Sequence, residues 1–224
     1  MDWTALGVSF RLSFWTMVLL VFAGMPIAYW VAFSRWRFKF LVEAIVALPL
    51  VLPPTVLGFY VLISIGPRSP LGGLYRDITG SLLPFSFEGL LLASVLYSLP
   101  FAVQPFASAF GAVDRRLIEA SHCLGATRWR TFRRVILPLS LPGVVTGMVL
   151  SFAHTLGEFG VVLMVGGNLA GKTRTASISI YDSVQALDYA PAFQTSLLLL
   201  AVSFAVLVVT YWLQKSVWAA WPAK

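Results

Sequence analysis

Residues 114–138, DRRLIEASHCLGATRWRTFRRVILP, place six arginines between two long uncharged runs of the sequence. Asp114 is a good helix N-cap, and Gly125 suits the left-handed residue that follows a helix end. Helical spacing puts four residues between them on one face: Leu117, Ala120, Ser121 and Leu124. Thr127 can cap a second helix that continues into the next apolar run. The stretch therefore predicts a short amphipathic helix, a glycine corner and a basic helix.

The sequence on both sides of this stretch is too apolar for a soluble domain. Of the 224 residues, 58% are hydrophobic and 11% are charged, with a mean hydropathy of +0.84, whereas soluble proteins carry about 25% charged residues. Crossing a bilayer as a helix takes about 20 residues. Five runs of this length lack Asp, Glu, Lys and Arg: 12–34, 44–67, 89–113, 135–157 and 189–214. This composition excludes a soluble enzyme and a disordered chain.

These runs predict an all-α, polytopic transmembrane bundle that forms a single domain over residues 1–224. With their flanking residues, the expected spans lie near 6–33, 41–66, 88–113, 139–165 and 190–214. The basic stretch 114–138 then connects the third span to the fourth. Pro49, Pro53 and Pro54 interrupt the second span, because proline lacks a backbone N–H. We expect five spans, or six if these prolines divide the second span into two crossings.

The segments that connect the expected spans lie alternately on the two sides of the membrane. This divides nearly all the lysines and arginines into two groups. Eleven lie in one group of segments: Arg35, Arg37, Lys39, Arg115, Arg116, Arg128, Arg130, Arg133, Arg134, Lys215 and Lys224. The other group holds four, at 68, 76, 172 and 174. The positive-inside rule therefore places the N-terminus outside and the C-terminus in the cytoplasm. Because the charges lie between apolar runs, lipid headgroups explain the net charge of +7, and we expect no nucleic-acid partner.

The spacing within 114–138 carries a further signal. Glu119-Ala120-Ser121, three residues, Gly125, nine residues and the run VILP at 135–138 closely resemble the EAA loop of ABC importer permeases. The family pattern is EAA, three residues, Gly, nine residues and I-x-L-P, so Ser121 and Val135 are mild departures. In that family the loop is a coupling helix seated in a cytoplasmic ATPase subunit. The resemblance implies that the following residues couple this chain to an ATPase: Glu119, Ala120, Ser121, Gly125, Leu137 and Pro138.

Segments in and around the loop are similar to the molybdate permeases of that family, over roughly residues 40–185. They are LPLVLPPTVLGFYVL at 48–62, LGATRWRTFRRVILPLSLPG at 124–143, LGEFG at 156–160 and VGGNLAGKTRT at 165–175. The resemblance implies a multi-pass inner-membrane permease that translocates molybdate, and tungstate as a related anion. It also implies a homodimer with cytoplasmic ABC ATPase subunits, which bind the ATP, and an external molybdate-binding protein. The chain itself would then hold no cofactor, no metal and no catalytic residue.

Two alternatives stay open at this point. Sulfate and thiosulfate permeases share the LGEFG-like segment but are usually longer chains. A self-contained secondary transporter belongs to a different class. Such a protein typically has internal repeats and ionisable relays near the midplane of the membrane, and we find neither pattern in the sequence.

Residues 166–173, GGNLAGKT, match the phosphate-binding pattern G-x-x-x-x-G-K-[ST]. A phosphate-binding loop of this type needs a preceding strand and a following helix on the cytosolic side. Here the segment follows an expected membrane helix and faces outside, so we do not expect a nucleotide site. Lys172 and Arg174 line the outer mouth of a pathway or lie among lipid headgroups, two readings of equal weight.

Three polar residues within the expected spans are candidates for a pathway or gate. Thr55 follows the proline pair of the second span, and interrupted helices often flank substrate paths, although a purely structural kink is as plausible. Ser98 lies close to two further prolines in the third span. Glu158 is expensive to bury in lipid, and a carboxylate repels an oxyanion. We therefore expect it to be structural or gating, paired with His154 or capped by Thr155 and backbone N–H groups.

The expected topology can be tested by cysteine labelling in intact spheroplasts after Cys123→Ser removes the native thiol. Lys172→Cys and Arg76→Cys should react with a membrane-impermeant maleimide. Arg37→Cys and Arg130→Cys should remain unlabelled until the membrane is opened, since the basic segments face the cytoplasm. The reverse labelling pattern would invert the orientation and remove the argument against the phosphate-binding reading of 166–173.

Overall fold

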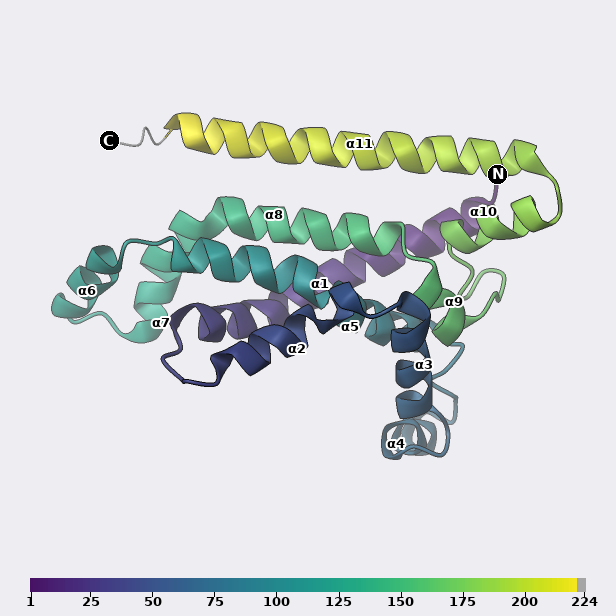
Figure 1. The fold of residues 1–224 in the computed structure, drawn as a ribbon, viewed down its shortest axis with the longest axis horizontal. Helices are drawn as coiled ribbons and strands as arrows, with labels where there is room; N and C mark the ends of the chain where they lie inside the picture. Colours follow the sequence, from purple (N-terminus) through teal and green to yellow (C-terminus); the bar gives the residue numbers. More distant parts are fainter. Residues whose placement is uncertain (221–224) are drawn as a thin grey trace.

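The computed structural model describes residues 1–220, with side chains described up to residue 208 and at 210 and 211. Every regular element in this part of the chain is helical, as predicted (Figure 1). The elements are α1 (Trp3–Phe33), α2 (Lys39–Val51), α3 (Pro54–Ile65), α4 (Pro70–Thr79), α5 (Phe87–Gly111), α6 (Arg115–Cys123), α7 (Arg128–Thr131), the π-helical turn η1 (Phe132–Ile136), α8 (Leu137–Leu156), α9 (Gly160–Gly166), α10 (Ala176–Gln185) and α11 (Tyr189–Ala220).

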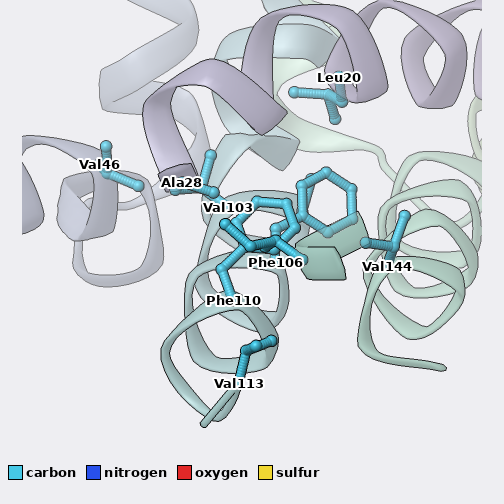
Figure 2. Packing of buried hydrophobic residues seen from close by; sticks show 10 residues of the cluster. Leu20, Ala28, Val46, Val103, Phe106, Phe110, Val113 and Val144 are labelled. Atoms are coloured by element: carbon cyan, nitrogen blue, oxygen red, sulfur yellow. The ribbon is translucent and has the colours of Figure 1, made fainter. Parts of the chain in front are cut away.

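Helices α1, α5 and α8 pack against one another and form the centre of the bundle. Their facing side chains include Leu20 of α1, Phe106 and Phe110 of α5, and Val144 of α8. Figure 2 shows these side chains converging between the helices. Both phenylalanines are completely buried. Because lipid tails are as apolar as these side chains, close van der Waals packing holds membrane helices together more than burial from water does.

Two glycines of α8 allow α5 to approach closely. A Cβ atom at Gly147 would lie 2.6 Å from a ring atom of Phe106 and 3.0 Å from the carbonyl oxygen of Ala102. A Cβ atom at Gly143 would overlap the Cβ of Ala109. Small residues at helix contacts are the usual means of bringing membrane helices together, so these two positions set the distance between α5 and α8.

The second expected span, 41–66, is divided into two helices. α2 and α3 are bent by 113° relative to each other at the break between Val51 and Pro54. The interruption predicted from the prolines is confirmed, although Pro49 lies inside α2. Only Pro53 lies in the break, and Pro54 is the first residue of α3. With 13 residues, α2 is about 20 Å long, which is shorter than the roughly 30 Å of a bilayer core.

The fourth expected span, 139–165, is also interrupted. α8 ends at Leu156, α9 begins at Gly160, and the three residues between them are not helical. At the other end α8 continues from α7 through the π turn η1, in which the N–H of Leu137 donates to the carbonyl of Phe132. By length and composition the described residues contain four helices that can cross a membrane, or five spans if α2 and α3 count as one.

The elements gather at two ends of the bundle. The N-terminus, α4, α9 and α10 lie at one end, and α6, α7 and the end of α11 lie at the other (Figure 1). Within the described residues, the segments that carry ten of the eleven basic residues are thus separated from those that carry four, as the sorting of the sequence predicts. The eleventh, Lys224, lies outside the described residues. Which end faces the cytoplasm remains the prediction made above.

The role of close packing can be measured with a matched pair of glycine substitutions. Gly147→Ala should lower the free energy of unfolding by about 1–3 kcal/mol, because the new methyl group overpacks against Phe106. Gly7→Ala, in α1, should be neutral or stabilising by up to about 1 kcal/mol, since nothing lies within 4 Å of its Cβ position. Thermal unfolding of both variants in detergent tests this. Equal midpoints for both would mean that α5 and α8 are not held by close contact.

Candidate functional site

The two interrupted spans meet each other at their breaks. A Cβ atom at Gly160, the first residue of α9, would lie 2.7 Å from the Cβ of Pro54, the first residue of α3. A Cβ atom at Gly58 would lie 2.8 Å from the Cβ of Met164. Two glycines, one from each partner, therefore permit α3 and α9 to pack directly. The contact brings together two segments that are about one hundred residues apart in the sequence.

A pocket of about 540 Å³ lies beside this contact. Its lining residues are Pro54, Thr55, Glu158, Phe159, Gly160, Leu163 and Met164. Two of the residues singled out from the sequence, Thr55 and Glu158, thus share one pocket. The sequence marked each of them by a local signal, a proline pair and an intramembrane carboxylate. Their proximity comes only from the crossing of α3 and α9.

Glu158 is engaged in holding the break between α8 and α9. Its side chain is only 7% exposed. Its Oε1 accepts a hydrogen bond of 2.9 Å from the backbone N–H of Val161, in the first turn of α9. Its own N–H donates to the carbonyl of Thr155 at 3.3 Å. The expected capping by backbone N–H groups is therefore confirmed. The two other expected partners are engaged elsewhere, since His154 bonds to Ser98 and the Thr155 hydroxyl donates to the carbonyl of Ser151.

His154 instead begins a chain of hydrogen bonds between α8 and α5. Its Nδ1 lies 2.9 Å from the hydroxyl of Ser98, and that hydroxyl lies 2.9 Å from the hydroxyl of Thr155. Thr155 donates its only hydroxyl proton to the carbonyl of Ser151. Ser98 must then donate to Thr155, which makes Nδ1–H of His154 the donor to Ser98, because each hydroxyl has a single proton. Ser98, predicted from the sequence, is the centre of this chain.

Aromatic residues on one face of α5 surround the His154 ring. The ring stacks on Phe101 with centroids 3.9 Å apart and lies 4.8 Å from the ring of Tyr97. The same face of α5 continues through Gln104 and Ser108, both exposed. Our sequence analysis overlooked Tyr97 and Phe101 as site residues. Their spacing of four residues, continued by Gln104, was the signal that could have revealed this face.

Arg174 and Lys172 occupy different surroundings at the end that holds the N-terminus. Lys172 is exposed. The guanidinium of Arg174 donates to Oδ1 of Asn168 at 2.6 Å and lies 3.6 Å and 3.9 Å from carboxylate oxygens of Asp182 and Asp2. Arg174 thus ties the loop before α10 to the start of α1. Of the two predicted mouth residues, only Lys172 carries a charge that is unpaired among the residues that the structure describes.

Asp2 is the N-cap of α1 as well as a partner of Arg174. Partial burial on its own would raise the pKa of the Asp2 carboxyl. Hydrogen bonds from the Ala5 N–H and the Thr4 hydroxyl, together with the positive charge of Arg174, outweigh that effect and leave the pKa below its ordinary value. The carboxylate therefore stays charged, which keeps both the cap and the ion pair in place.

The segment that matches a phosphate-binding pattern folds around its own threonine. The Thr173 hydroxyl donates to the carbonyl of Gly166 at 2.7 Å and accepts from the N–H of Leu169 at 3.2 Å. The segment follows helix α9 and not a strand. The hydroxyl that such a loop would present to a metal-bound nucleotide is here used to close the loop.

The amphipathic helix, glycine corner and basic helix predicted for 114–138 are all present. Asp114 accepts the N–H of Arg116 at the start of α6, and Thr127 accepts the N–H of Arg130 at the start of α7. Gly125 has φ +76. Its N–H donates to the carbonyl of His122, and the next N–H donates to the carbonyl of Ser121, which is the hydrogen-bond pair of a Schellman motif.

Ser121 links α6 to α7. Its hydroxyl lies 3.0 Å from the hydroxyl of Thr131, and Thr131 is buried. A groove of about 420 Å³ runs between α6 and the basic helix, and its lining residues are Leu117, Ala120, Ser121, Leu124, Ala126, Arg130, Arg134 and Val135. Glu119 and Ala120 are exposed. Leu137 and Pro138 do not line this groove, because they form the start of α8.

Comparison with known proteins connects this geometry to a family. The family of binding-protein-dependent transport system inner membrane components matches residues 24–219. The chain belongs to this family. The matched range contains the α3–α9 crossing, the Ser98–His154 chain and the whole of 114–138. The chain is thus a multi-pass inner-membrane component of a binding-protein-dependent transport system, as predicted.

Individual relatives cover nearly the whole chain. A molybdenum transport system permease protein of Azotobacter vinelandii is 49% identical over 210 residues, which are 94% of this chain and 93% of that protein. A molybdenum transport system permease protein of Escherichia coli K12 is 34% identical over 96% of this chain and 94% of that protein. Among solved structures, an inward-facing methionine ABC transporter has the same fold, with a TM-score of 0.70 at 20% identity over 96% of this chain and 94% of that chain.

Proposed function

We propose that this chain is the permease subunit of an ATP-driven importer that carries molybdate across the inner membrane. The observation that carries this proposal is the 49% identity to the molybdenum permease of Azotobacter vinelandii over 94% of the chain. Tungstate, a tetrahedral dianion of the same kind, would pass by the same route. Sulfate is the alternative substrate.

The pathway would lie between two copies of this chain. Gln104 and Ser108 are exposed on α5, within the apolar span, and exposing such groups to lipid is costly because hydrocarbon offers them no hydrogen bonds. A second copy facing this side of α5 would enclose a water-lined path in which both side chains are solvated. The homodimer therefore explains exposed polar groups that a single chain in lipid would not tolerate.

The α3–α9 crossing is our candidate for the gate of this path. Each helix is joined to its span by a short non-helical break, at 52–53 and at 157–159, and breaks of this kind absorb rotation in hinge movements. Thr55 is exposed and offers a hydroxyl group to a passing oxyanion. The Ser98 hydroxyl is buried and donates to Thr155, so its role in the gate is structural. The carboxylate of Glu158 is held by α9, so its role is to shape the gate. Weak binding of the anion along the path would allow its release on the other side of the membrane.

Helix α6 is our candidate for the contact with a cytoplasmic ABC ATPase, which would bind and hydrolyse the ATP while this chain performs no chemistry. A periplasmic molybdate-binding protein would deliver the substrate at the opposite end. Glu119, Ala120 and Ser121 are on α6, and Gly125 fixes the corner that follows it. Leu137 and Pro138 lead directly into α8, so a movement of α6 is passed to a core helix.

The corner at Gly125 offers a matched pair of variants that tests coupling. Gly125→Val should reduce molybdate uptake at least tenfold, because a β-branched residue strongly disfavours positive φ. Gly125→Asn should retain most of the uptake, since asparagine tolerates this conformation. No atom lies within 4 Å of the Cβ position, so both changes act through the backbone alone. Uptake per ATP hydrolysed, in vesicles with the assembled transporter, is the measurement.

Two results would contradict the coupling role. Full uptake in Gly125→Val would show that the corner is unimportant, and full uptake in Glu119→Lys would show that the exposed face of α6 contacts no ATPase. Membrane insertion and dimer formation, measured in the same preparations, serve as controls. Lys172→Ala should leave ATP hydrolysis by the complex unchanged.

The substrate can be tested in a strain that lacks its own molybdate permease. Supplying this chain with its matching ATPase and binding protein should restore molybdenum-cofactor enzyme activity at trace molybdate, and excess sulfate should not inhibit it. Sulfate uptake without a response to molybdate or tungstate would overturn the substrate while leaving the family membership intact. Uptake without any ATPase subunit would favour a self-contained transporter.

A further inference from the structure

The connection between α1 and α2 carries an alternation of basic and aromatic residues, RWRFKF at 35–40. Four aromatic rings form a continuous row from the last turn of α1 across the connection to the first turn of α2. Successive ring centroids are 5.9, 5.7 and 6.3 Å apart, from Trp30 to Trp36, Phe38 and Phe40. We call this row the aromatic ladder. All four side chains are exposed by 38–55%.

The ladder suits the boundary between lipid tails and headgroups. Its outer members, Trp30 and Phe40, lie on helices that enter the apolar part of the bundle, and its inner members lie on the connection. Large aromatic side chains are favoured at this depth of a membrane, where one end is apolar and the other is wet. The occupant that fits the ladder therefore has an apolar part.

The arginines beside the ladder are free to bind an anion. Arg35 and Arg37 are exposed and, within the described part of the chain, pair with no carboxylate. The guanidinium carbon of Arg37 lies 4.6 Å from the centroid of the Phe38 ring, which leaves its N–H edges available. Lys39, the third cation of the motif, is engaged by Glu43 at 3.6 Å.

The backbone of the connection is held in one shape. The N–H of Trp36 donates to the Ser34 hydroxyl at 3.2 Å, and the N–H of Lys39 donates to the carbonyl of Trp36 at 3.1 Å. The two arginines are therefore presented from a defined turn, two residues apart. A guanidinium group recognises phosphate oxygens through paired N–H donors, and a turn that is already ordered saves the entropy of arranging them.

We propose that this turn is a binding site for the phosphate headgroup of an anionic phospholipid, with Arg35 and Arg37 on the phosphate and the aromatic ladder along the acyl chains. The combination of free cations and an exposed apolar row matches an amphiphile, whereas an acidic protein surface would match only the cations. The orientation predicted from the sequence places the turn in the cytoplasmic leaflet, which carries anionic lipid. The site is independent of the transported substrate.

Native mass spectrometry of the assembled transporter tests the proposal. The complex is purified in mixed micelles with equal phosphatidylglycerol and phosphatidylcholine, and retained lipids are counted. The wild type should retain phosphatidylglycerol preferentially. In the double variant Arg35→Gln/Arg37→Gln, the ratio of retained phosphatidylglycerol to retained phosphatidylcholine should fall about fivefold for each arginine removed. This is the effect expected of a basic residue near an anionic membrane surface.

Two single substitutions, each of which removes one positive charge, are controls for the loss of a single arginine. Lys39→Gln should have little effect, because that ammonium is already paired. Arg68→Gln, at the other end of the bundle, should have none. Trp36→Ala should weaken retention of both lipids alike, since it shortens the apolar part of the site without changing the charge.

Several results would overturn the site. Equal retention of the two lipids by the wild type is one, and an unchanged preference in the double variant is another. Loss of the ATPase from the double variant with lipid retention unchanged would make the turn a protein contact. If the double variant does not assemble, added salt provides the test on the wild type. Screening should reduce phosphatidylglycerol retention and leave phosphatidylcholine unchanged, and equal loss of both would refute the role of the arginines.

Discussion

Backbone N–H and carbonyl groups have no water to bind in the hydrocarbon core of a membrane, so an interrupted helix there must be protected by protein. This constraint governs the molecule, because two of its spans are interrupted. The breaks are placed against each other, with Pro54 in contact with Gly160. Glu158 supplies the acceptor for the first turn of α9, and the carbonyl of Val165 near its end accepts the N–H of Phe85.

The same constraint applies to the polar side chains close to the breaks. A carboxylate is acceptable at Glu158 because the backbone N–H of Val161 donates to it. The Ser98 hydroxyl is acceptable because it belongs to a chain of hydrogen bonds that runs from the His154 ring to the carbonyl of Ser151. By contrast, the side chains of Gln104 and Ser108 are exposed and form no such hydrogen bonds with the described residues. A polar side chain whose hydrogen bonds are formed within the single chain is therefore assigned a structural role. One that is left exposed is assigned to the pathway.

The parts of the fold that depend on local chemistry were predictable from the sequence. Charge-free runs indicate the spans, and Asp114, Gly125 and Thr127 indicate the boundaries of α6 and α7, because caps and positive φ are properties of a few neighbouring residues. Prolines also indicate that the second span is interrupted. The 113° turn of α3 was not predictable, since its direction depends on Gly58 of α3 fitting against α9 and on Gly160 of α9 fitting against Pro54. Likewise, only tertiary structure decides that His154 binds Ser98 and that Arg174 is held by Asp2 and Asp182. The membrane orientation and the roles of the coupling residues stay predictions.

The joint between α6 and α7 consists of two neutral hydroxyl groups, Ser121 and Thr131, 3.0 Å apart. Six arginines surround this joint in the sequence, yet none of them forms it. Ion pairs weaken as dissolved salt rises, whereas a partly buried bond between uncharged groups is affected far less. The contact between α6 and α7 is therefore kept at low and at high ionic strength. A movement of α6 can then be passed on even when salt screens the charges around the joint.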